Sequence, residues 1–377
     1  MTRNLPSLDL KRNYDRIRDE IREALEGVLD SQHFIMGPEV ESLERETESY
    51  LGVDHAIGCA SGTDALLLAL MGLDIKEGDE VITTPYSFFA SASCIARLGA
   101  TPVFADVDPD TYLIDMDKVM ENITSKTRAF MTVHVFGQMV PLEGFYDDLV
   151  PKGIEIIEDA AQAFGSWREK GKDLKRAGTW GKAGCFSFFP TKNLGGYGDG
   201  GMVTTNESDY SERISRLRVH GAGKTYYHDE LGINSRLDAI QAAILRVKLR
   251  HLDEWLEERR LAADRYKVLA AEYGLLEKIS LPVELDGNFH IYHQYVIRAQ
   301  DRDELMKYLS SQEISSRIYY PVCLHLQKCF SYLGYSEGDM PVAESLSKST
   351  LALPIFPEIT SEEQERVISA IADFYKG

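Results

Sequence analysis

The sequence predicts an α/β protein with a mainly parallel sheet covered by helices on both faces, followed by a second, smaller domain. Three observations lead to this fold class. Helical and strand-like patterns alternate from the N-terminus onward, which is typical of parallel sheets. The chain has 377 residues, 44% of them hydrophobic, and is too long for one ordinary core. After Asn234 the alternation gives way to one long helical pattern.

The alternation can be followed element by element. Apolar residues at helical spacing predict helices, and short apolar runs between turn residues predict strands. The expected helices are residues 13–29, 39–51, 63–71, 88–99, 116–123 and 142–149. The expected strands are residues 55–59, 80–84, 101–107, 128–135, 154–159 and 201–205.

The second half of the chain begins with a helical tract over residues 235–273, which we expect to connect two domains. The large domain is expected to span residues 1–245, and a small α+β domain residues 246–377. Strands near residues 292–298 and 315–319 and a terminal helix over residues 361–375 would build the small domain.

The charge excludes several classes of partner. The chain has 41 basic and 60 acidic residues, a net charge of -19, which repels phosphate backbones and anionic membranes. Small anions can still bind at a helix N-terminus. The longest uncharged apolar run, residues 65–73, is far shorter than the ~20 residues of a membrane span. We expect a cytoplasmic protein with no nucleic-acid or membrane partner.

The cysteines and histidines give no sign of a metal site. The five cysteines include no C-x-x-C pair, so we expect reduced packing residues. The segment HIYH, residues 290–293, has no nearby cysteine or carboxylate ligands in the sequence, so structural histidines are the better interpretation.

Polar residues that follow apolar strands are candidates for a ligand site, because ligands of open α/β sheets collect at the carboxyl ends of strands. In CASGTDALLLAL, Gly62 and Thr63 would present backbone amides at the start of a helix and form a phosphate cradle. For this segment taken alone, a simple Ser/Thr helix cap is the favoured interpretation.

Two further segments offer groups for a planar ring. Asp159 directly follows a buried-type strand, with Gln162 three residues later, and its carboxylate could pair with a ring nitrogen. Phe88 follows strand EVITT and could lie flat on the ring. The alternatives are a turn-forming aspartate and a core aromatic residue.

The segment SFFPTKNLGGYGDGG supplies Ser187 from a strand and Lys192 from the turn after it. A free lysine is neutral in only about one of ~2,500 molecules at pH 7, so a lysine for carbonyl chemistry needs a desolvated pocket or exchange with a preformed imine. A solvated surface lysine is the alternative. A cradle, a flat aromatic, an aspartate and a lysine are together the parts that hold pyridoxal phosphate.

A nucleotide-binding protein is a second interpretation of the glycine cluster. A Walker loop needs Lys and then Ser or Thr after its second glycine, whereas Lys192 precedes the glycines. A Rossmann fingerprint should open a helix, whereas GMVTT after the glycines has a strand pattern. Both contexts are wrong for a phosphate loop.

The sequence resembles the DegT/DnrJ/EryC1/StrS family of pyridoxal-phosphate sugar aminotransferases. The similar segments span nearly the whole chain: SGTDAL, EDAAQAFGS, SFFPTKNLGGYGDGG, NSRLDAIQAAIL, YYPVCLHLQ and LALPIFPE. The resemblance implies an aspartate-aminotransferase-like, fold type I large domain with a mainly parallel seven-stranded sheet, which binds pyridoxal phosphate. It also implies a homodimer with shared active sites.

The resemblance implies a role for each candidate residue. Lys192 would form the Schiff base and move the proton, and Asp159 would keep the pyridine nitrogen protonated. The other cofactor-binding residues would be Gly62, Thr63 and Ser187 at the phosphate, Phe88 and Gln162 at the ring, and Asn234 reaching into the neighbouring subunit's site. Tyr320 and His325 resemble residues that line the sugar pocket, although Cys323 stands where the family usually has proline.

The implied reaction moves an amino group from an amino acid, expected to be L-glutamate, to a nucleotide-linked keto sugar. Similarity of two segments to 3-keto members favours amination at C3, for a surface glycan or lipid amino sugar. Amination at C4 and a non-catalytic, cofactor-binding regulator remain alternatives. The dehydratase branch is disfavoured, because its lysine position looks replaced by histidine.

Overall fold

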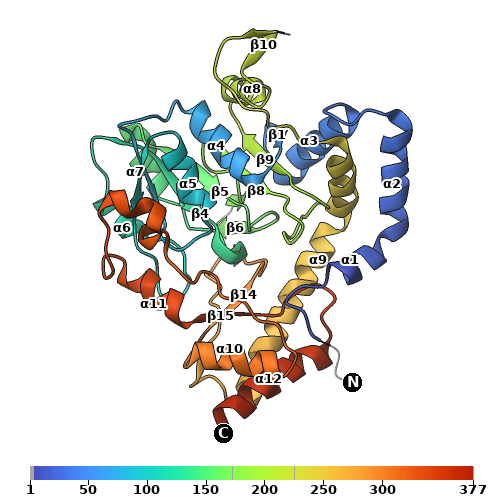
Figure 1. Ribbon diagram of the computed structural model, residues 1–377, viewed down its shortest axis with the longest axis vertical. Coiled ribbons are helices and arrows are strands. Elements are labelled where there is room, and N and C mark those ends of the chain that lie inside the picture. The colour runs from blue at the N-terminus through green and yellow to red at the C-terminus, as the bar shows by residue number, and fades with distance from the viewer. Residues whose placement is uncertain (1–3, 172, 225, 377) are drawn as a thin grey trace.

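A seven-stranded sheet forms the centre of the computed structural model, which describes residues 4–171, 173–224 and 226–376 (Figure 1). The strands lie in the order β1 (His55–Cys59), β9 (Gly201–Thr205), β8 (Ala183–Ser187), β5 (Glu155–Asp159), β4 (Thr127–Val133), β2 (Glu80–Thr83) and β3 (Thr101–Phe104). Within this described sheet, β9 runs antiparallel to its two neighbours, β1 and β8, and the other neighbouring pairs are parallel. The expected mainly parallel sheet of seven strands is confirmed.

Helices cover both faces of this sheet, because side chains of consecutive strand residues point to opposite faces. Cys185 and Val203 face one buried cluster, whereas Phe186 and Met202 face another. The first face is covered by α4 (Gly62–Gly72), α5 (Ala90–Arg97) and α8 (Ser208–Leu217), and the second by α3 (Pro38–Leu51) and α9 (Ala239–Glu272).

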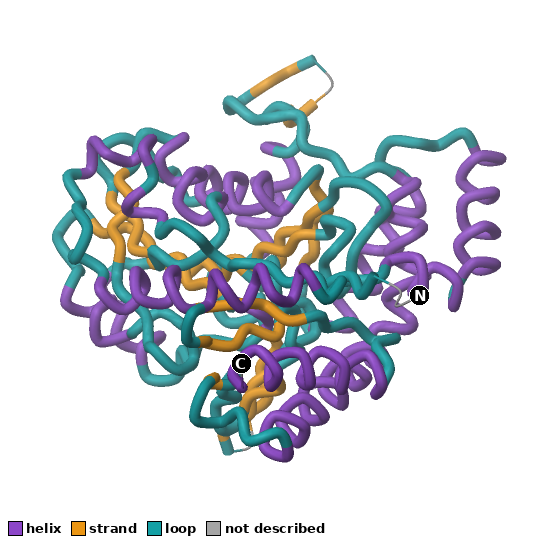
Figure 2. The backbone as a smooth tube through the Cα atoms, turned by 60° about the horizontal axis from the view of Figure 1, so that its bottom comes forward, coloured by secondary structure: helices purple, strands orange, loops and turns teal. Residues whose placement is uncertain are grey.

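The C-terminal residues form a smaller α+β layer below the large sheet (Figures 1 and 2). Its antiparallel sheet consists of β12 (Ile279–Ser280), β14 (Tyr295–Ala299) and β15 (Thr350–Leu353), and its helices are α10 (Arg302–Ser311), α11 (Pro341–Ser349) and α12 (Ser361–Lys376). The second half of α9 packs into the same core through Tyr266. The expected boundary after residue 245 falls inside α9, and the division into domains stays a prediction.

The other described elements are short. The helices are α1 (Leu10–Arg16), α2 (Arg18–Ser31), α6 (Met116–Glu121) and α7 (Phe145–Leu149), with 3-10 turns η1 (Val135–Gly137), η2 (Val150–Lys152), η3 (Leu324–Leu326) and η4 (Lys328–Leu333). The strands are β6 (Trp167–Lys170), β7 (Asp173–Arg176), β10 (Ala222–Lys224), β11 (Tyr227–His228) and β13 (Asn288–Phe289). In the described part of the chain, no helix has both the length and the hydrophobicity that a membrane crossing requires.

Two expected elements differ from the structure. The helix expected over residues 13–29 is interrupted at Ile17, which leaves helical geometry and is buried. The strand expected over residues 315–319 is wrong: Arg317 forms only an isolated bridge with Ala352. The strand beside β14 is instead β15, because its side chains are fully buried against the C-terminal helices.

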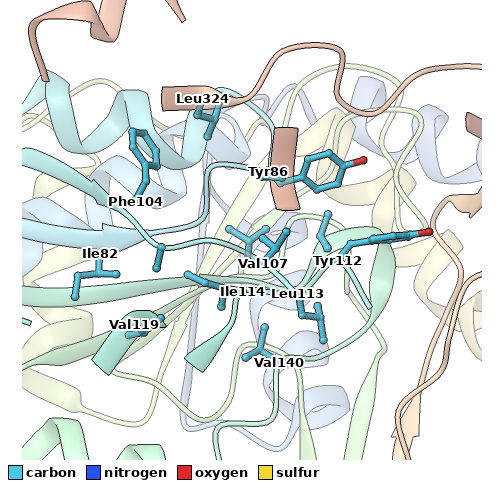
Figure 3. Close-up of a cluster of buried hydrophobic side chains, with 14 of the residues drawn as sticks. Ile82, Tyr86, Phe104, Val107, Tyr112, Leu113, Ile114, Val119, Val140 and Leu324 are labelled. Atoms are coloured by element: carbon cyan, nitrogen blue, oxygen red, sulfur yellow. The ribbon is translucent and has the colours of Figure 1, made fainter. Parts of the chain in front are cut away.

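One hydrophobic cluster joins the two layers. Tyr86 follows β2 and Phe104 is the last residue of β3. Leu324, from the C-terminal part of the chain, packs in the same cluster (Figure 3). The Leu324 amide donates a hydrogen bond to the Pro85 carbonyl at 2.8 Å. Residues after β2 are therefore fixed against η3, which brings C-terminal side chains to the carboxyl edge of the large sheet.

A buried carboxylate organises the middle of the sheet. Glu158 of β5 is fully buried and accepts hydrogen bonds from His134 Nε2 at 2.8 Å and from the amides of Gly178, Trp180 and Gly181 at 2.7–2.9 Å. Burial alone would raise the pKa of Glu158, but these donors outweigh it and hold the pKa below its ordinary value. The charge fixes the turn that leads into β8.

Glu158→Gln should lower the free energy of unfolding by about 3 kcal/mol, because an amide NH2 cannot accept from donors that converge on a carboxylate. Glu155→Gln, on the same strand but half-buried, is the matched control and should change stability by less than about 0.5 kcal/mol. Urea unfolding of both variants measures the difference. Equal effects would contradict a structural role for the buried charge.

Candidate active site

Asp159 ends β5 and lies at the carboxyl edge of the sheet. Its buried carboxylate accepts hydrogen bonds from Ser91 Oγ at 2.7 Å and from the Ala161 amide at 3.2 Å. Burial raises the pKa of Asp159, although both bonds and the charge of Lys192 act the other way. A buried carboxylate with few donors gains most from a positively charged partner, such as a protonated ring nitrogen.

Lys192 lies in the loop after β8 and is half-buried. Its amide donates a hydrogen bond to the Phe189 carbonyl at 2.8 Å, which closes the turn. Burial lowers the pKa of Lys192 to about 8, while the charge of Asp159 raises it. At pH 7 about one molecule in ten then carries the neutral amine, far more than for a free lysine. This environment suits a lysine that attacks a carbonyl group.

The start of α4 is the segment expected to form a phosphate cradle. Ser61 caps the helix, and its Oγ accepts from the Asp64 amide at 3.1 Å. The amides of Gly62 and Thr63 have no acceptor within the helix because they lie in its first turn. Thr63 is exposed, and Gly62 and Ser187 are partly exposed. These groups can therefore receive an anion from solvent at the positive end of the helix dipole.

Close packing joins the cradle to the strand that precedes Lys192. A Cβ atom on Gly62 would lie 2.5 Å from the Cβ atom of Ser187, and one on Gly201 would lie 2.3 Å from the Ser61 carbonyl oxygen. Gly201 pairs with both Cys59 and Ser187 across the sheet. Glycine at these two positions lets the α4 amides approach the Ser187 hydroxyl.

The other glycines after Lys192 have protein neighbours. A Cβ atom on Gly196 would lie 2.7 Å from Gln241 Oε1, and one on Gly195 would lie 2.6 Å from the Pro190 carbonyl oxygen. Gln241 also accepts from the Tyr197 amide at 2.7 Å. In this structure, packing of the loop on itself and under α9 requires these glycines.

Gln162 and Tyr320 are directly bonded, which links a candidate cofactor residue to a candidate substrate residue. Gln162 Nε2 donates to Tyr320 Oη at 2.7 Å, and Gln162 Oε1 accepts from the Phe136 amide at 2.7 Å. The Tyr320 ring also packs near the rings of Tyr86 and Phe136. Tyr320 therefore reaches the site from the C-terminal part of the chain.

Phe88 and Asn234 are both exposed, and each lies close in the chain to a serine that is hydrogen-bonded to a carboxylate. Phe88 is 60% exposed and lies one helical turn before Ser91, the donor to Asp159. Asn234 is exposed, and the following residue, Ser235, donates to Asp64 Oδ2 at 2.8 Å. Phe88 is thus placed beside the Asp159 group, and Asn234 beside the α4 cradle with its side chain in solvent.

His325 lies apart from the group around Lys192. It is buried beside the rings of Phe104 and Tyr335, and its Nε2 atom is 3.1 Å from Glu344 Oε1. The structure therefore does not bring His325 together with the other candidates, and its expected contact with a sugar stays a prediction.

The sequence analysis missed two residues of this site. Ser91 binds Asp159, and its only sequence signal was its place one turn after Phe88 in PYSFFASAS. His293 approaches the Lys192 loop, with Nδ1 2.7 Å from Asn193 Oδ1. No spacing rule could have paired residues 100 positions apart, and HIYH was interpreted only as structural.

The fold and the residues around Lys192 fit an α/β enzyme that uses a lysine and binds an anion at a helix N-terminus. The chain belongs to the DegT/DnrJ/EryC1/StrS aminotransferase family, whose sequence profile matches residues 15–372. The expected family and the expected enzyme class, a pyridoxal-phosphate-dependent nucleotide-sugar aminotransferase, are confirmed.

Many relatives match this chain, several of them over nearly its full length. A protein of Geobacillus stearothermophilus named pleiotropic regulatory protein is 47% identical, with 99% of each chain covered. The UDP-N-acetyl-3-dehydro-α-D-glucosamine 3-aminotransferase of Acidithiobacillus ferrooxidans is 41% identical, with 98% of each covered. The dTDP-3-amino-3,4,6-trideoxy-α-D-glucose transaminase of Streptomyces venezuelae is 40% identical, covering 99% of this chain and 97% of the relative.

Solved structures agree with this assignment. DesV of S. venezuelae superposes with a TM-score of 0.95 at 38% identity, with both chains fully covered. The ntda protein of Bacillus subtilis has a TM-score of 0.92 at 28% identity, covering 100% of this chain and 86% of that one, and holds the cofactor PMP, pyridoxamine phosphate. The cofactor expected from the sequence, pyridoxal phosphate, is confirmed for this family.

Gly62→Ala tests the close approach of the cradle to Ser187. The added Cβ atom should lower the free energy of unfolding by about 1–3 kcal/mol and the affinity for pyridoxal phosphate about tenfold, because it separates α4 from Ser187. Gly27→Ala in α2 is the control, since its Cβ atom would meet nothing within 4 Å. Thermal unfolding and equilibrium binding measure both effects. Equal behaviour of the two variants would show that the approach is not required.

Proposed function

We propose that this protein transfers an amino group from an amino acid, with L-glutamate as the expected donor, to a nucleotide-linked keto sugar, and that the ketone is at C3. The observation that carries this proposal is the placement of a lysine with a lowered pKa and a buried, donor-poor aspartate beside a helix N-terminus with free amides. The C3 assignment is supported by the relatives from A. ferrooxidans and S. venezuelae, whose names specify position 3.

The residues present fit pyridoxal phosphate. The α4 amides and the Ser187 hydroxyl offer hydrogen bonds to a phosphate, where a side chain on Gly62 would block them. Asp159 accepts from two donors, and the charges of Lys192 and His134 lower its pKa; a protonated ring nitrogen would add a further cation beside the carboxylate. The exposed Phe88 ring can cover a planar group.

In this proposal the cofactor supplies a ring that accepts the electron pair of the C–H bond broken in the amino donor. Asp159 holds a proton on the ring nitrogen, since a buried carboxylate is stabilised by a cation. Lys192 Nζ accepts the proton from the donor and returns it, which a pKa of about 8 permits near neutral pH. Gln162, fixed by Tyr320 and the Phe136 amide, orients the ring hydroxyl.

We further propose that a second copy of the chain completes each site. Large apolar side chains are exposed at the start of α5, namely Phe88 and Phe89, and in the segment around Lys192, namely Phe189 and Tyr197. The β10–β11 hairpin projects from the body of the molecule (Figures 1 and 2), and its neighbourhood exposes Tyr227 by 71% and Leu231 by 95%. Burial in a homodimer would remove this apolar surface from water and place Asn234 at the partner's site.

The proposed setting is the cytoplasm, and the proposed product is an amino sugar for a surface glycan or lipid. The protein's strongly negative charge does not oppose a nucleotide-linked substrate, because Lys192 and the α4 N-terminus make the site locally positive. Amination at C4 and a regulatory, non-catalytic role are the alternatives. The regulatory alternative is supported by the name of the G. stearothermophilus relative, pleiotropic regulatory protein.

The protein loaded with pyridoxamine phosphate should regain the absorbance of the pyridoxal form when mixed with a 3-keto nucleotide sugar, and not with its 4-keto isomer. Lys192→Ala should slow this conversion about 10³-fold, because the proton acceptor is lost. Lys118→Ala, at an exposed position on α6, is the control and should react as the wild type does. Conversion with the 4-keto sugar alone would reassign the position. Inertness towards both would support the regulator.

A further inference from the structure

His293 lies between the two layers of the molecule, directly before β14. It is 5% exposed, and its amide donates to the Phe136 carbonyl at 2.8 Å. Its ring approaches the residue that follows Lys192: the distance from His293 Nδ1 to Asn193 Oδ1 is 2.7 Å. One side chain of the C-terminal layer is thus bonded to the lysine loop of the large sheet.

The surrounding bonds decide which ring nitrogen carries the proton. Asn193 Nδ2 donates to the Ile291 carbonyl at 3.5 Å, so Oδ1 is the amide atom that faces His293. A carbonyl oxygen can only accept, so His293 Nδ1 must donate and Nε2 keeps a lone pair. The pKa of His293 is well below its ordinary value, because of burial first and then the charges of Lys192 and Arg259. The imidazole is therefore neutral.

His293 also connects the lysine loop to the segment that fixes Gln162. The Phe136 carbonyl accepts from the His293 amide, and the Phe136 amide donates to Gln162 Oε1 at 2.7 Å. A Cβ atom on Gly137 would lie 3.2 Å from the backbone nitrogen of His293, so the segment around Gly137 packs closely against the segment around His293. Movement of His293 would change the positions of both Asn193 and Gln162.

We propose that His293 is a positioning residue for Lys192, which acts through Asn193 by a hydrogen bond from Nδ1 and holds the lysine in its desolvated setting. This inference rests on the proposed function for one point, the catalytic role of Lys192; the hydrogen bond itself does not depend on it. The neutral ring matters as well, because a protonated imidazole would place a second positive charge beside the lysine loop. A histidine that merely fills the core would not need the Asn193 bond.

Two matched variants distinguish these roles. Asparagine carries its polar atoms at the same distance from the backbone as His293 Nδ1, so His293→Asn can keep a donor towards Asn193. His293→Leu fills similar space without a donor. Asn193→Ala removes the acceptor. If the hydrogen bond between His293 and Asn193 positions Lys192, then His293→Leu, Asn193→Ala and the double variant should shift the titration of Lys192 by the same amount. His293→Asn should leave this titration as it is in the wild type.

The readout is the pH midpoint of lysine acylation in the cofactor-free protein, followed residue by residue by mass spectrometry. Lys192 should titrate near 8 in the wild type and in His293→Asn. In the other three variants the midpoint should rise by about one unit, a tenfold change in proton affinity, because water reaches a less firmly held ammonium. Lys248, which is buried and has a pKa of about 8, donates from Nζ to the Gly195 carbonyl in the same loop at 2.7 Å; its midpoint is the internal control for general loosening of the loop and should not move, because its bond does not involve His293 or Asn193.

Additive shifts in the double variant, or equal shifts in His293→Asn and His293→Leu, would overturn the proposal. A parallel shift of Lys248 would also overturn it, since general loosening would then be the cause. If His293→Leu does not fold, Asn193→Ala and His293→Asn still carry the test. Because the readout needs no cofactor, failure of the wild type to bind pyridoxal phosphate would instead contradict the proposed function.

Discussion

Two adjacent buried carboxylates at the end of β5 are the constraint on which the rest of the site depends. Glu158 is satisfied by His134 and three amides, whereas Asp159 has two donors. A buried charge is costly unless it is bonded or paired. Glu158 therefore fixes the turn into β8, and Asp159 remains able to attract a cation. Glu158 thus stabilises the scaffold, and Asp159 is the residue that we propose binds the ligand.

The sheet topology converts this constraint into a site. Parallel strands bring Asp159 and Ser187 to one edge, and antiparallel β9 starts at that edge with Gly201 against the α4 cradle. The loop that carries Lys192 is bordered by these strands and by α9. The lysine is thus placed by packed backbone with little freedom to move, which is how enzymes keep a reactive group desolvated and oriented.

Local patterns predicted most of this arrangement. Apolar runs identified the strands, and the position of Asp159 directly after IEIIE identified it as a ligand candidate. Long-range contacts were not predictable in this way: His293 and Asn193 are 100 residues apart, and β15 pairs with β14 and packs with residues of α9 and α10, which come much earlier in the chain. The strand expected at residues 315–319 failed for the same reason, since its pairing partner decides whether a strand forms.

Lys192, whose pKa is raised by the charge of Asp159, is the residue that we propose holds pyridoxal phosphate covalently. Borohydride reduction of the protein loaded with pyridoxal phosphate, followed by peptide mapping, identifies the lysine that is bound. We expect a reduced, cofactor-modified peptide at Lys192, with the buried Lys248 unmodified. Modification at Lys248 or at surface lysines without Lys192 would contradict it.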